Sequence, residues 1–136
     1  MSYIALTANS SGTGVITLTA PNTNSNYRIM LPSNAISTLT DGATITPDFE
    51  TNTNFTVTLA GNRTMANPSN LAAGQSGSIF IIQDGTGSRT LSWGSYWDFI
   101  GGTAPTLTTA AGAVDRVDYV VRTTGSIHAV FTANYS

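Results

Sequence analysis

Apolar side chains alternate with threonine, serine or asparagine along most of this chain, a period of two that is typical of β-strands with one buried face. In VITLTA (15–20), Ile16 and Leu18 share one face while Thr17 and Thr19 share the other. The same pattern predicts further short strands at residues 3–8, 27–31, 55–59, 78–83, 89–93, 106–108, 113–123 and 127–131.

Two segments refine this prediction. SIFIIQ (78–83) is apolar on both faces, so we expect it to be the central and most buried strand. DGTGS (84–88) has the residues of a tight turn and predicts a β-hairpin that joins this strand to residues 89–93. Residues 35–50 are rich in threonine and are expected to form a loose connection.

Many short strands without a convincing helix indicate an all-β fold, either an antiparallel β-sandwich or a jelly-roll-like domain with an N-terminal β arm. We place the arm and first strands at residues 1–40 and the sandwich at residues 41–136. Ten residues with the right alternation are expected in the core: Val57, Leu59, Ile79, Ile81, Leu91, Val117, Tyr119, Val121, Ile127 and Phe131.

Charge is scarce. The chain has five arginines, no lysine, seven acidic residues and 23 threonines in 136 residues. The arginines are scattered, so we expect no nucleic-acid partner, and no apolar run reaches the length that membrane insertion needs. A chain with few charges and many strand edges is expected to associate with itself.

Catalytic residue types are almost missing. His128 is the only histidine, there is no cysteine, and no nucleophile-elbow pattern occurs. Asp115 and Asp118 are three residues apart, which places them on opposite faces of a strand, and Asp118 is expected to pair with an arginine on its own face. We therefore expect no catalysis, no cofactor and no metal site.

Four aromatic residues lie close together at Trp93, Tyr96, Trp97 and Phe99. Aromatic side chains anchor cores and subunit interfaces, and they also stack on sugar rings. Burial in the core or at an interface is the favoured interpretation, and glycan contact is the alternative. In the N-terminal arm, the residues expected to attach to a neighbour by strand addition are Tyr3, Ile4, Leu6, Ile16 and Leu18.

Several segments resemble virion structural proteins of tailed bacteriophages. They are FTVTLAGNRTMANPSN (55–70), GQSGSIFIIQDGTGSRTLSWGS (74–95), GGTAPTLTT (101–109) and AVDRVDYVV (113–121). GTGVITLTAPNTNSNYRIMLPS (12–33) is similar to strand units in fibre and appendage proteins of phages that infect cyanobacteria and marine bacteria. Together these segments cover nearly the whole chain.

This resemblance implies a component of the virion. The absence of a coiled coil or long repetitive shaft favours a capsid decoration (cement) protein on the outer surface of the head. Such a protein would bind the major capsid protein, commonly as a homotrimer, and bridge capsomers. The alternative is a tail-fibre, adaptor or receptor-binding subunit that contacts host surface glycans through the aromatic cluster.

Overall fold

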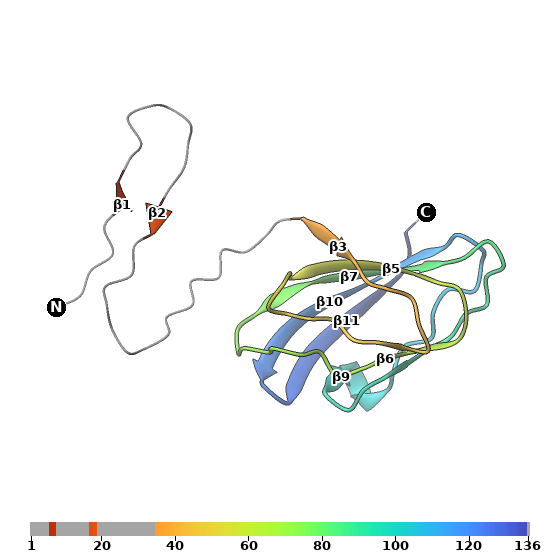
Figure 1. Ribbon diagram of the computed structural model, residues 1–136. Helices are drawn as coiled ribbons and strands as arrows, with labels where there is room; N and C mark the ends of the chain where they lie inside the picture. The colour runs from red at the N-terminus through yellow and green to blue at the C-terminus, as the bar shows by residue number, and fades with distance from the viewer. Residues whose placement is uncertain (1–5, 8–16, 19–34, 136) are drawn as a thin grey trace. The chain divides into compact units, whose positions relative to one another are not determined.

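The computed structural model describes residues 6–7, 17–18 and 35–135 (Figure 1). The chain divides into two compact units, Met1–Leu31 and Pro32–Ser136. In the first unit, β1 (Leu6–Thr7) pairs antiparallel with β2 (Thr17–Leu18), and Leu6 lies opposite Leu18. The other residues predicted to attach the arm, Tyr3, Ile4 and Ile16, lie outside the described residues, as does the predicted strand 27–31.

The second unit is built from two β-sheets. The larger sheet has the strand order β3 (Ile36–Thr38), β5 (Asn54–Leu59), β7 (Ser76–Gln83), β10 (Val114–Thr123), β11 (Ser126–Tyr135) and β9 (Trp97–Phe99). The smaller sheet has the order β4 (Thr44–Ile45), β6 (Arg63–Met65) and β8 (Leu91–Trp93). One 3-10 turn, η1 (Ile100–Gly102), is the only helical element among the described residues. The predicted all-β class is confirmed.

The chain passes three times from the larger sheet to the smaller one, and we call these passages coil 1 (β3–β4), coil 2 (β5–β6) and coil 3 (β7–β8). Corresponding strands of successive coils pair in parallel, β3 with β5 and β5 with β7 in one sheet, and β4 with β6 and β6 with β8 in the other. Only β7, β10 and β11 pair antiparallel in these two sheets (Figure 1). The pairing is therefore mixed, whereas the sequence predicted an antiparallel arrangement. The predicted boundary at residues 40/41 falls between β3 and β4, both in the second unit.

The predicted hairpin at residues 84–88 is wrong, because β7 and β8 belong to different sheets. The segment is a corner between the sheets. Asp84 Oδ1 accepts hydrogen bonds from the backbone N–H groups of Thr86 and Gly87, at 3.0 and 2.9 Å, and the carboxylate also binds the Arg89 guanidinium. These bonds hold the pKa of Asp84 down at about 2, with the Arg89 contact as the main cause. The turn residues correctly predicted a change of chain direction, but they did not show which sheet the following strand joins.

The core lies between the two sheets. Nine of the ten predicted core residues are buried, and Phe131 is half-buried against them. The residue at the centre was not predicted: Phe49, in the β4–β5 connection, is fully buried. Its ring stacks on Tyr119 at 4.6 Å and on Phe55 at 5.8 Å, and it meets Trp97 edge-on at 6.5 Å. Burial raises the pKa of the Tyr119 phenol, whose hydroxyl donates to the Thr53 carbonyl.

Candidate functional site

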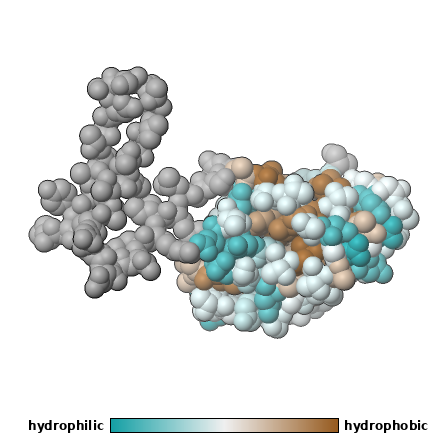
Figure 2. All heavy atoms as spheres, in the orientation of Figure 1, coloured by the Kyte–Doolittle hydropathy of each residue, from teal (hydrophilic) through white to brown (hydrophobic). Residues whose placement is uncertain are grey.

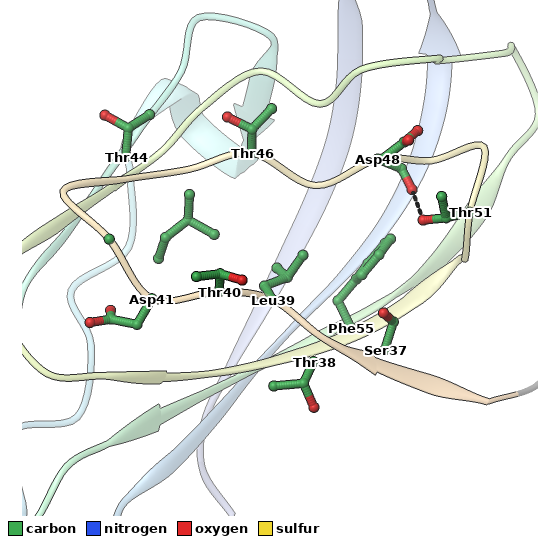
Figure 3. A pocket seen from close by; sticks show the side chains of 12 residues that line it. Ser37, Thr38, Leu39, Thr40, Asp41, Thr44, Thr46, Asp48, Thr51 and Phe55 are labelled. Atoms are coloured by element: carbon green, nitrogen blue, oxygen red, sulfur yellow. Dashed lines mark hydrogen bonds between the residues drawn. The ribbon is translucent and has the colours of Figure 1, made fainter.

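A hollow of about 410 Å³ lies at coil 1, at one end of the coil stack. β3 and β4 are the outermost strands of their sheets on this side, and within residues 35–135 no strand pairs with their free edges. Figure 3 shows the two runs of chain that form the hollow, one carrying Ser37 to Asp41 and the other Thr44 to Asp48. The third coil, by contrast, is followed in the larger sheet by β10 and β11.

Apolar side chains form the floor of this hollow, and hydroxyl groups form its rim. Leu39, Ile45 and Phe55 belong to the hydrophobic core or pack against it. Figure 2 shows apolar atoms on the face turned to the viewer, bordered by polar ones. Five hydroxyl-bearing residues line the hollow without a side-chain hydrogen bond to any described residue: Ser37, Thr38, Thr40, Thr44 and Thr46. Their hydroxyls are therefore available to a ligand or to water.

The two carboxylates of the hollow are already engaged. Arg63 donates to Asp41 from Nε at 2.9 Å and from NH2 at 2.6 Å, which holds the pKa of Asp41 below its usual value. Asp48 accepts from the Asn70 amide at 2.7 Å and from the Glu50 backbone N–H at 3.0 Å, and these bonds lower its pKa. Thr51 donates its hydroxyl to the Asp48 backbone carbonyl (Figure 3). Both carboxylates are therefore ionised at neutral pH and held by neighbours.

The hollow is lined mainly by apolar and hydroxyl-bearing residues. The hollow contains no histidine, lysine or cysteine that could act as a base or a nucleophile. In the part of the chain that the structure describes, no three His, Cys, Asp or Glu residues come together as a metal site would require. What the hollow offers is a set of methyl and hydroxyl groups over an aliphatic and aromatic floor.

The predicted aromatic cluster lies elsewhere and is largely internal. Trp97 is only 6% exposed, and its Nε1 donates to the Ala66 carbonyl at 3.0 Å. Trp93 packs edge-on against Trp97 at 5.2 Å and against Phe99 at 4.9 Å. Trp93, Tyr96 and Phe99 are half-buried against the core. A sugar therefore has no access to the faces of Trp97, and the glycan role that the sequence suggested for this residue does not fit its position.

The other residues with candidate chemistry are separated. Asp115 and Asp118 lie on opposite faces of β10, as predicted. Asp118 pairs with Arg116 at 2.8 Å on the outside of the sheet, which confirms the expected ion pair. Asp115 is buried and accepts hydrogen bonds from the Thr108 backbone N–H, the Thr108 hydroxyl and the Asn134 backbone N–H. Asp115 thus joins the 103–113 loop and the end of β11 to β10. His128 is exposed on β11.

Residues 45–126 match a family model described as "Putative phage tail fibre C-terminal domain". The chain belongs to this family. The match runs from the end of β4 to the start of β11, so it includes most of the second unit of the chain. No curated protein and no solved structure matches the chain.

The family match supports the prediction that this chain is a phage structural protein and a component of the virion. The narrower resemblance to capsid decoration proteins and to phages of cyanobacteria and marine bacteria stays a prediction. No helix among the described residues is long and apolar enough to cross a membrane.

The hollow was not predicted from the sequence, because residues 35–50 were expected to form a loose connection. A weak signal was present: in ATIT (43–46) apolar residues alternate with threonine, as they do in the longer strands. β3 and β4 have only three and two residues, so the alternation is too short to separate a strand from a loop.

Proposed function

We propose that this protein is a non-catalytic attachment domain of a phage tail, and that it binds a neutral saccharide of the host surface in the coil 1 hollow. One observation carries the proposal: the hollow at coil 1 has an apolar floor and is lined by five residues whose hydroxyls make no side-chain hydrogen bond to any described residue. The family match supports a place in the tail.

The chemistry of the hollow favours a neutral sugar. Pyranose rings present C–H faces and hydroxyl groups together, and threonine side chains supply a methyl group and a hydroxyl in the same way. Asp41 and Asp48 are ionised and engaged by Arg63 and Asn70, so they repel an anionic sugar and have no free oxygen pair for a cation. A few oriented polar groups over an apolar surface are the usual composition of a ligand site.

Removing two rim hydroxyls tests this assignment. Thr40→Val with Thr46→Val keeps the shape and the strand preference of both side chains but deletes their hydrogen-bonding groups. We expect the double variant to bind at least about tenfold more weakly, since two hydrogen bonds contribute on the order of 1 kcal/mol each. The measurement is binding of the full chain to an array of neutral and anionic saccharides, followed by titration calorimetry with the best neutral ligand.

Thr103→Val is the matched control, because Thr103 is exposed and lies outside the hollow. It should bind as the unaltered chain does. If no neutral saccharide is retained, or if the double variant binds with undiminished affinity, the hollow is not the attachment site.

The number of copies of this protein per virion distinguishes a tail component from a head protein. A tail component is expected at tens of copies per particle, whereas the capsid decoration protein that the sequence suggested would bind the major capsid protein at hundreds of copies. Quantitative mass spectrometry of purified particles gives the number directly. A count in the hundreds, with particles lacking the protein bursting on heating, would overturn the tail location.

A further inference from the structure

The outer face of the larger sheet, on the side away from the core, is unusually apolar. Solvent-facing sides of antiparallel sheets are normally polar. The described residues include five large hydrophobic side chains that are exposed, and four of them lie on this face: Ile36, Val120, Val130 and Tyr135. Val120 and Val130 are each 50% exposed. Phe80 and Ile82 add half-buried apolar surface to this face on β7, the strand next to β5.

Strand register shows how the apolar side chains are arranged on this face. Ile82 lies opposite Val114 on β10, and Val114 lies opposite Tyr135 on β11. Val130 pairs with Asp118, and Val120 pairs with His128, so the two valines are diagonal neighbours. Side chains at such positions on one face are close enough to touch. Apolar groups therefore form two clusters on this face, one around Val114 and one around Val120 and Val130, and the side chains of Arg116 and Asp118 lie between them.

The centre of the face carries one balanced pair of charges. Arg116 NH2 lies 2.8 Å from Asp118 Oδ2, and the Arg116 guanidinium lies 4.9 Å from the centre of the Tyr135 ring. The Ser78 hydroxyl donates to the other oxygen of Asp118. The same face also carries Arg122 on β10 and Asp98 on β9, so its arginines and aspartates are equal in number, and a second copy can place each charge near its opposite across the contact.

The composition and size of the face also suit a protein contact. Arginine, tyrosine and phenylalanine are enriched at interfaces, where lysine and glutamate are depleted. The six strands are about 4.8 Å apart and three to ten residues long, and together they cover a flat area on the order of 600 Å². A standard stable interface buries about 800 Å² of accessible surface on each partner. The accessible surface of a sheet face exceeds its flat area because side chains project from it, so this face is of a similar size. The net charge of −2 adds little repulsion between copies.

We infer that the outer face of the larger sheet is the surface through which copies of this chain pack against one another. The contact is sheet against sheet, with Val120, Val130 and Tyr135 excluding water around the Arg116–Asp118 pair. The inference is separate from the saccharide site, since Val120, Val130, Arg116 and Asp118 do not line the hollow.

The test is the mass of the full chain in solution, measured by sedimentation equilibrium over a range of concentrations. We expect the unaltered chain to form a defined oligomer, and Val120→Asp with Val130→Asp to be monomeric because two copies would bring buried like charges together. Val120→Thr with Val130→Thr preserves side-chain shape and strand preference, so it should remain folded and associate at least about tenfold more weakly.

The control for added charge is Ala73→Asp with Ala111→Asp, at two exposed loop positions. This variant should keep the oligomer of the unaltered chain. A monomeric unaltered chain, or a threonine variant that associates with full strength, overturns the inference. Saccharide binding by the monomeric variant, measured with a monovalent ligand, should be unchanged, which keeps this test distinct from that of the hollow.

Discussion

Phe49→Ala is expected to lower the free energy of unfolding by about 3–5 kcal/mol, the usual loss when a buried phenylalanine leaves a cavity. Phe49 has no exposed surface and contacts three other aromatic rings, those of Phe55, Trp97 and Tyr119. Such a loss is a large part of the total stability of a typical domain, about 5–15 kcal/mol. Urea denaturation followed by tryptophan fluorescence measures it, since Trp97 lies against the altered site.

Ile100→Ala is the control for this prediction. Ile100 is a large apolar residue outside the sheets, in η1, but its side chain is 83% exposed. Its removal should change the free energy of unfolding by less than about 0.5 kcal/mol. A loss below about 1 kcal/mol for Phe49→Ala would show that the β4–β5 connection does not anchor the core as the structure indicates.

Phe49 also shows where sequence reasoning is weakest. It stands between polar residues in TPDFET (46–51), with no alternation that predicts burial. Its position depends on tertiary contacts: its backbone N–H donates to the Ser69 carbonyl, and its carbonyl accepts from the Gln75 side chain. Neither partner can be recognised from the local sequence. A buried residue in a connection is thus visible only once the sheets are placed.

Long strands were predictable because alternation over five or more residues is a strong signal. The predicted strands 55–59, 78–83 and 113–123 correspond to β5, β7 and β10 with small shifts at their ends. β6 and β9 have three residues each, too few to show a period, and they were missed. The predicted strand 106–108 does not form, and Leu107 is buried from a loop instead.

Parallel stacking of the coils, and the hollow that it creates, could not be predicted in the same way. Alternation tells which side of a strand is buried, but it is the same for parallel and antiparallel partners. The hollow exists because coil 1 has a neighbour on one side only in the described residues. That is a property of pairing and not of residues 36–46 themselves. The aromatic cluster and its burial were both expected from the sequence, but the sheets that bury it could not be predicted.

Gly77→Ala is expected to prevent stable folding, because it should lower the free energy of unfolding by on the order of 4 kcal/mol or more. Gly77 lies on β7 opposite Tyr119, and a methyl group there would stand 1.8 Å from the Thr53 carbonyl oxygen and 2.9 Å from the Tyr119 hydroxyl. The Thr53 carbonyl is held in this position by a hydrogen bond, since the Tyr119 hydroxyl donates to it at 2.7 Å. The β4–β5 connection would have to move away from β7, which would also displace the stacked ring of Phe49.

Circular dichroism and urea denaturation of the purified variant measure this effect, and Gly85→Ala is the matched control. Gly85 is exposed, and a methyl group there meets no atom within 4 Å. Replacing it should leave the free energy of unfolding within about 1 kcal/mol, because alanine only reduces the freedom of the unfolded chain. Equal stability of the two variants would mean that the connection before β5 does not pass over Gly77. Selective loss in Gly77→Ala places the Thr53 carbonyl against β7 in solution.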